Sequence, residues 1–134
     1  MSDFVCDVSV VAAWAFADES TPVSRRAFEL AQRYAVLVPA MFPFELANVM
    51  AVAVRRDRLE PSDARSFLVR IEELGLQELA SVDPVVTLFD AARRYDLSAY
   101  DAAYLELALE SGRPLATDDV ALRKAARRAG VALI

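Results

Sequence analysis

The segment from Ser98 to Asp119 restricts the possible fold more than any other part of this sequence. Ser98 is a typical N-cap residue with an acid three positions later, and apolar residues then recur at helical spacing. Gly112 predicts the end of this helix, and residues 114–116 form a short apolar run that leads to Thr117. The two acids that follow open another helix. A helix, a buried strand and a second helix in such close succession predict an α/β protein.

The rest of the chain shows the same alternation of short apolar runs with segments of helical spacing. The apolar runs predict strands at residues 4–7, 35–38, 76–81, 114–117 and 131–134. Two cap-and-proline pairs mark helix starts, at Thr21–Pro22 and Asp83–Pro84. Together with helical spacing, they predict helices at residues 10–16, 22–34, 42–56, from 61 onward, from 84 onward and from 119 to 130. We therefore expect an α/β sandwich with a central, mostly parallel sheet of four to five strands.

Length and composition narrow the class of protein. The chain has 134 residues, a common size for one domain, so we expect residues 1–134 to form a single domain. Hydrophobic residues make up 56% of the chain, which argues against disorder. No apolar run reaches the roughly 20 residues that a membrane helix needs. No secretory signal is evident and Cys6 is the only cysteine, so we expect a cytoplasmic protein without a disulfide or a membrane partner.

The sequence contains no histidine, which excludes several kinds of catalytic site. Histidine acid–base catalysis and Ser-His-Asp triads are impossible, and one cysteine cannot make a zinc site. Any chemistry must therefore use carboxylates, hydroxyls, lysine or arginine. The net charge of −5 argues against binding nucleic acid through bulk charge. Several arginines occur in pairs, which fit either solvated helix faces or a local basic patch.

Several polar side chains are predicted to gather where strands end and helices begin. In parallel sheets, this edge is where binding sites form. The first strand and the starts of three helices place four acids there, at Asp7, Glu45, Asp101 and Asp119. Hydroxyl groups lie beside two of the strand ends, at Ser9 and Thr117. The pattern therefore predicts an acidic cluster at one edge of the sheet.

The acids have structural explanations as well as a chemical one. Acids in first helical turns stabilise helices, so Asp101 can partner a Ser98 cap and Asp118 or Asp119 can cap the last helix. Asp7 lies between apolar runs, and a buried charge needs a partner. Crowded carboxylates repel one another unless a cation is bound, and Mg²⁺ or Mn²⁺ prefers oxygen ligands. Such an ion can polarise a phosphoryl oxygen and activate a water, which would suit cleavage of phosphodiesters.

Four segments of the sequence resemble the PIN-domain ribonucleases, and within them the VapC-type toxins of toxin–antitoxin pairs. These segments are VCDVSVVAAWAFADE (5–19), VPAMFPFELANVM (38–50), LSAYDAAYLELALESGRPLATDDVAL (97–122) and AARRAGVALI (125–134). They cover about half of the residues and occur in the same order as in the family. A single acidic motif would be weak evidence, but four in order with this spacing are a specific signal.

The resemblance implies a PIN-like three-layer α/β/α sandwich and a function. The function is an endoribonuclease that uses Mg²⁺, or Mn²⁺ in its place, and leaves a 5′-phosphate and a 3′-hydroxyl. A homodimer and a cognate antitoxin that blocks the cleft are also implied. The four family acids correspond to Asp7, Glu45, Asp101 and Asp119.

We expect three of these acids, Asp7, Asp101 and Asp119, to hold the metal ion directly or through water. Glu45 would complete the metal shell or orient the attacking water. We expect three neighbouring side chains to support the ligands by hydrogen bonds: Ser9, Asn48 and Thr117. Asp118 stands beside the fourth acid, and the spacing from Thr117 favours Asp119 over it.

Two other functions are compatible with acids at strand ends. A PIN-like module could bind RNA or a protein without cutting, although all four acids are present. A phospho-receiver domain also places acids and a threonine at strand ends. It normally needs an early acid pair and a late strand that ends in lysine, and neither is evident here.

Overall fold

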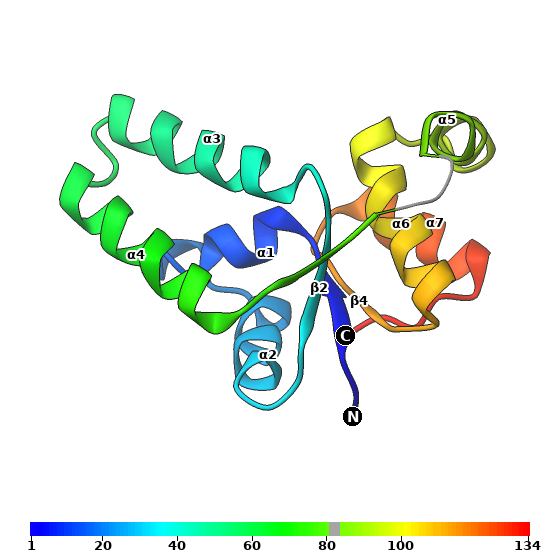
Figure 1. Ribbon diagram of the computed structural model, residues 1–134, viewed down its shortest axis with the longest axis horizontal. Helices are drawn as coiled ribbons and strands as arrows, with labels where there is room; N and C mark the ends of the chain where they lie inside the picture. The colour runs from blue at the N-terminus through cyan, green and yellow to red at the C-terminus, as the bar shows by residue number, and fades with distance from the viewer. Residues whose placement is uncertain (81–83) are drawn as a thin grey trace.

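A computed structural model describes residues 1–80 and 84–134 of the chain, and this part forms one parallel sheet with helices on both sides (Figure 1). The strands are β1 (Phe4–Cys6), β2 (Val36–Pro39), β3 (Gln77–Leu79) and β4 (Leu115–Ala116). Their order in the sheet is β3-β2-β1-β4, and every neighbouring pair is parallel. The predicted α/β class and the four-stranded parallel sheet are therefore confirmed within the described residues.

The helices form the outer two layers of the sandwich. On one side of the sheet lie α1 (Val8–Ala13), α2 (Pro22–Ala31), α3 (Phe42–Arg55) and α4 (Pro61–Leu74). On the other side lie α5 (Pro84–Tyr95), α6 (Ala99–Ser111) and α7 (Val120–Ala129). A 3₁₀ turn, η1 (Ala17–Glu19), follows α1. None of the helices in the described part of the chain is long and apolar enough to span a membrane.

The core lies between the sheet and both helix layers. The first strand is wholly buried, since Phe4, Val5 and Cys6 are all 0% exposed. This follows from its apolar sequence, which is typical of a central parallel strand covered on both faces. Helix α6 packs across β1, β2 and β4 and contributes the fully buried Leu105 to the core. Burial of this kind fixes the register of the strands and hence the positions of the residues that follow them.

Helix boundaries follow the caps expected from the sequence. The Thr21 side chain accepts a hydrogen bond from the Ser24 N–H at the start of α2, and Ser98 accepts one from the Asp101 N–H at the start of α6. Gly112 ends α6 in the left-handed region, with a φ of 66°. Glycine tolerates this conformation at low cost because it has no Cβ atom.

Two predicted strand boundaries differ from the structure, and two further predictions lie outside the described residues. Asp7 was expected to end the first strand, but it is the N-cap of α1, which begins at Val8. The short polar side chain at this position satisfies the first free N–H groups of the helix. Residues 131–134 were expected to form a strand, but the structure shows only a single bridge between Leu115 and Leu133. The predicted cap at Asp83 and the predicted end of the third strand at Ser81 lie outside the described residues.

Candidate active site

Strand order explains how residues far apart in the sequence come to lie at one edge. β1 is the central strand, between β2 and β4, and Asp7 follows it directly. Glu45 lies in the first turn of α3, the helix that follows β2. Asp119 is the N-cap of α7, the helix that follows β4. Asp101 lies in the first turn of α6, which packs against these strands. The topology therefore places all four acids at the carboxyl ends of the strands.

Asp7 is buried, with 5% exposure, and its carboxylate is held by hydroxyl groups. Thr117, which is 0% exposed, donates its hydroxyl to Oδ2 of Asp7 at 2.8 Å. Ser9 donates its hydroxyl to the same oxygen at 3.1 Å, and its backbone N–H lies 3.4 Å from Oδ1. The buried charge thus has polar partners, and within residues 1–80 and 84–134 no lysine or arginine forms an ion pair with it. Because no basic side chain neutralises Asp7, a bound metal cation can balance its charge.

Thr117 also connects the acid of the first strand to that of the last helix. The Asp119 backbone N–H donates to the Thr117 hydroxyl at 3.1 Å, while that hydroxyl donates to Asp7. A hydroxyl can do both because it carries one hydrogen and two lone pairs. The expected supporting role of Thr117 therefore has a geometric basis, a short hydrogen-bonded link from Asp119 to Asp7.

Glu45 is held by a tyrosine that sequence reasoning placed only on an apolar helix face. The hydroxyl of Tyr104 donates to Oε1 of Glu45 at 2.7 Å, and Tyr104 is 1% exposed. Burial and the neighbouring Glu45 raise the pKa of Tyr104, so its phenol keeps its proton and remains a donor. The signal was available in the sequence, since Tyr104 follows Asp101 by three positions and so shares its face of α6.

The four carboxylates lie near enough to repel one another. Burial raises the pKa of Glu45 and repulsion from Asp7 and Asp101 raises it further, whereas the Tyr104 bond lowers it. Burial also raises the pKa of Asp101, followed by repulsion from Asp119 and Asp7, with a hydrogen bond to Ser98 acting in the opposite direction. Acids from four different elements thus share one electrostatic environment, as carboxylates around a cation site would.

Asp118 and Asp119 have different surroundings. Asp119 is the N-cap of α7, and its Oδ1 accepts a hydrogen bond from the Leu122 N–H at 2.8 Å. Asp118 instead accepts the hydroxyl of Thr21 at 2.7 Å, at the start of α2. Of these two neighbours, Asp119 and not Asp118 is a cause of the raised pKa of Asp101. These contacts favour Asp119 as the fourth acid, in keeping with the expected spacing from Thr117.

Asn48 and Ser9, the other two residues expected to support the site, differ in their contacts. Ser9 is exposed and bonded to Asp7. Asn48 is exposed on α3, three positions after Glu45, and its side chain has no hydrogen bond within the described part of the chain. Its position on the helix puts it on the side of Glu45, where it is available to a ligand.

The sequence was compared with models of known protein families. Residues 4–128 match the PIN domain family. The chain belongs to that family. Comparison with curated proteins gave no significant match.

Two solved structures have a similar fold. The structure of PAE2754 from Pyrobaculum aerophilum has a TM-score of 0.69 and 22% sequence identity, covering 92% of this chain and 79% of that one. A chain of VapBC2 from Rickettsia felis, in a crystal structure with a DNA fragment from their promoter, has a TM-score of 0.68. It is 11% identical, with coverage of 100% of this chain and 98% of that one. The predicted PIN-like three-layer sandwich is confirmed by these likenesses of fold.

The donor atoms of this PIN domain are all oxygens, which suits Mg²⁺ or Mn²⁺. Over residues 1–80 and 84–134, no three acidic or cysteine side chains are arranged to hold a metal ion as they stand. Hydrogen bonds already occupy one oxygen of Asp119 and both of Asp7. Mg²⁺ in phosphoryl-transfer sites is commonly held by one or two carboxylates and several waters. The residues fit that mode of binding, rather than a cage made of protein ligands alone.

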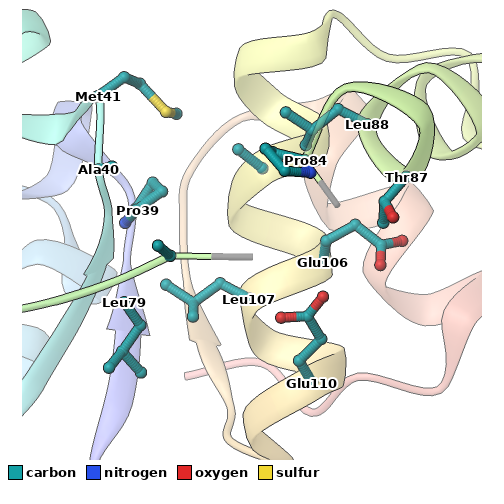
Figure 2. Close-up of a pocket in the computed structure, with 12 residues that line it drawn as sticks. Pro39, Ala40, Met41, Leu79, Pro84, Thr87, Leu88, Glu106, Leu107 and Glu110 are labelled. Atoms are coloured by element: carbon teal, nitrogen blue, oxygen red, sulfur yellow. The ribbon is translucent and has the colours of Figure 1, made fainter. Parts of the chain in front are cut away.

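The PIN domain also has a groove away from the acids. It is a cavity of about 270 Å³ between β3, α5 and α6, and none of the four acids lines it. Its walls are largely apolar, including Pro39, Leu79 and Leu107, while Glu106 and Glu110 extend from α6 on the side of α5 (Figure 2). The candidate active site is therefore the edge of the sheet where the acids lie, and this apolar groove has different chemistry.

Proposed function

We propose that this PIN domain is an endoribonuclease that depends on Mg²⁺, with Mn²⁺ as a possible substitute. Membership of the family supports the proposal, and so does a site made only of carboxylates and hydroxyls in a chain without histidine. The single observation that carries it is the Thr117 hydroxyl, which donates to Asp7 at 2.8 Å and accepts the Asp119 N–H at 3.1 Å, and so joins acids from opposite ends of the sequence. Three acids that repel one another are stabilised by a shared divalent cation.

In this proposal Asp7, Asp101 and Asp119 hold the ion, directly or through water. When bound, the ion polarises a phosphoryl oxygen and lowers the pKa of a water molecule, which supplies the nucleophile. Thr117 and Ser9 fix the orientation of the Asp7 carboxylate through their hydroxyl groups. Carboxylates oriented in this way need no rearrangement when the ligand arrives.

Glu45 is suited to receive the proton of the attacking water. Its carboxylate can act as a base, and the Tyr104 hydroxyl fixes one of its oxygens by a hydrogen bond of 2.7 Å. The water oxygen then joins phosphorus, the bond from phosphorus to the 3′-oxygen breaks, and that oxygen takes up a proton. The products carry a 5′-phosphate and a 3′-hydroxyl. Asn48 lies one turn from Glu45 on α3, and we expect it to support the site by a hydrogen bond.

We further propose that the protein is the toxin of a type II toxin–antitoxin pair, of the VapC type. The sequence segments described above and the fold shared with a chain of VapBC2 support this assignment. In this role it acts in the cytoplasm as a single-domain homodimer, and a cognate antitoxin blocks the acidic edge. A short upstream reading frame that encodes a DNA-binding protein with a flexible tail would support the pairing.

The proposed function is tested by neutralising single acids. Asp7→Asn and Asp101→Asn should abolish Mg²⁺-dependent cleavage of RNA, measured on gels, while circular dichroism shows a folded protein. Asparagine is also a good N-cap, so Asp7→Asn keeps an acceptor for the cap of α1, removes the charge and replaces one accepting oxygen by an amide donor. Asp118→Asn is the matched control, because Asp118 contacts Thr21 and should not be needed. Cleavage at the wild-type rate by either active-site variant contradicts the assignment.

One observation favours a second function, in which the PIN domain binds RNA or a protein without cutting. No three acids in the described residues are arranged to hold an ion as they stand. Calorimetry with millimolar Mn²⁺ distinguishes the two functions, since the binding module should show no heat of metal binding. The phospho-receiver alternative has no support from the family match.

A further inference from the structure

Two aromatic side chains at the acidic edge are exposed to solvent. Phe44 is 79% exposed and Tyr100 is 63% exposed. Each precedes a candidate acid by one residue, Phe44 before Glu45 and Tyr100 before Asp101, in the first turns of α3 and α6. Neither has a ring contact or a side-chain hydrogen bond within the described residues. No contact among residues 1–80 and 84–134 accounts for two exposed rings beside the site.

The first turns of α3 and α6 are joined directly. The bond from Tyr104 to Glu45 links the two helices at 2.7 Å, and Tyr104 follows Tyr100 by one helical turn. Repulsion from Asp101 is also among the causes that raise the pKa of Glu45, in keeping with this link. Phe44 and Tyr100 therefore lie in two helical turns that meet at one acidic site, on separate elements of the chain.

We propose that Phe44 and Tyr100 stack on unpaired bases next to the phosphate that is cut, so that the substrate must be single-stranded at that point. This inference rests on the proposed ribonuclease function. Isolated exposed apolar residues are normal on protein surfaces, but these two flank the acids that must meet the phosphate. Aromatic rings in this position are the usual platform for bases of single-stranded nucleic acid.

Because the protein is negatively charged, base stacking would be an important contribution to RNA binding. The chain has a net charge of −5 and the site itself carries four acids, so the phosphate backbone gains little from bulk electrostatics. Stacking on an uncharged ring attracts a base without regard to these charges. A protein partner on the same rings is the competing explanation, and the experiment below separates the two.

The test is steady-state cleavage of a short single-stranded RNA in Mg²⁺ by wild type and ring variants. Phe44→Ala and Tyr100→Ala should each raise KM by about 5- to 150-fold, the equivalent of about 1–3 kcal/mol per stacked base. The kcat should stay the same, because stacking is equally strong in the ground state and the transition state. The increase should persist from about 50 to 200 mM salt, unlike an effect on phosphate contacts.

Matched variants separate stacking from loss of apolar surface. Phe44→Tyr and Tyr100→Phe keep a ring and should behave as wild type, whereas Phe44→Leu keeps bulk but should resemble Phe44→Ala. Phe89→Ala removes a ring that is 59% exposed on α5, a helix that carries none of the four acids, and it should have no effect. Direct binding of the same RNA in EDTA, followed by fluorescence anisotropy, should rank the variants in the same order.

Several results would overturn the inference. Wild-type KM values for the alanine variants, or a wild-type KM for Phe44→Leu, would show that the rings do not stack on bases. Unchanged RNA cleavage with weakened self-association in light scattering would assign the rings to a protein interface. If wild type cuts RNA and only the ring variants behave unexpectedly, the ribonuclease proposal stands; if wild type neither binds nor cuts RNA, both proposals fail.

Discussion

Helix α6 carries acids in two very different settings. At its first turn, burial and like charge raise the pKa of Asp101, and the like charges come from Asp7 and Asp119 on other elements. Further along, burial and like charge also raise the pKa of Glu106, but its acidic neighbour is Glu110, one turn away on the same helix. Arg94 of α5 opposes this shift, and both glutamates line the apolar groove (Figure 2).

Asp101 and Glu106 both have a raised pKa, so a raised pKa does not by itself identify an active site. Two glutamates on one turn of a helix repel each other wherever they occur, and an arginine nearby relieves them. Asp101 meets acids that only the folded topology brings near, at the edge where strands end and helices begin. Convergence of distant segments, rather than the size of a shift, distinguishes the first turn of α6 as functional.

The largest expected effect separates the two settings directly. Asp101→Asn should lower the rate of RNA cleavage by about a thousandfold, since a ligand to a catalytic ion contributes several kcal/mol to the transition state. Glu106→Gln makes the same chemical change in the groove and should leave the rate within about twofold. Initial rates on one RNA under saturating Mg²⁺ check both. Equal losses for the two variants would break the comparison.

Thr117 should have the next largest effect. Thr117→Val keeps the shape of the side chain but removes the donor to Asp7 and the acceptor of the Asp119 N–H. We expect a loss of about 10- to 100-fold in activity and about 1–3 kcal/mol in the free energy of unfolding. Ser9→Ala removes the longer bond from an exposed hydroxyl, so it should cost less on both measures. A harmless Thr117→Val would disprove the link through this hydroxyl.

The smallest effect concerns thermal stability and pH. Because the folded state raises the pKa of Glu106 and of Asp101, ionising either carboxyl costs stability, and the cost grows as pH rises through the raised pKa. Without metal at about pH 7, Glu106→Gln and Asp101→Asn should therefore raise Tm. The gain should vanish below about pH 3.5, where both folded and unfolded carboxyls are protonated.

Added Mg²⁺ should change Tm differently in the three proteins. The ion should raise the Tm of wild type and of Glu106→Gln, since it binds only the folded state. It should not raise the Tm of Asp101→Asn. Scanning calorimetry with and without Mg²⁺ makes the measurement, and an equal response of all three proteins would show that Asp101 is not a ligand.

Local signals in the sequence predicted most of the fold. Thr21, Ser98 and Gly112 mark helix ends through their own side chains or backbone freedom, and the structure confirms each of them. The boundary at Asp7 was wrong because a carboxylate after an apolar run can either end a strand or cap the next helix. Residues 131–134 were predicted to be a strand but form only one bridge, at Leu133. An apolar run does not reveal how many backbone hydrogen bonds the adjacent strand can offer to it.

The candidate site was only partly predictable. The four acids follow from their places at strand and helix ends. Tyr104 did not, because the pattern of α6 places it among core residues and its partner, Glu45, is distant in the sequence. The contact between Thr21 and Asp118 was equally invisible, and it is this contact that separates Asp118 from Asp119. Side-chain contacts between distant elements depend on the order of the strands in the sheet, and a single sequence does not reveal that order.

Binding of Mn²⁺ measured by calorimetry tests the central claim most directly, because the claim is that acids from different elements share one divalent ion. Wild type and Glu106→Gln should bind Mn²⁺ in a saturable manner at about pH 7, while Asp7→Asn and Asp101→Asn should lose that binding. The account is contradicted if wild type binds no Mn²⁺ at millimolar concentration, or if Asp101→Asn binds it as wild type does.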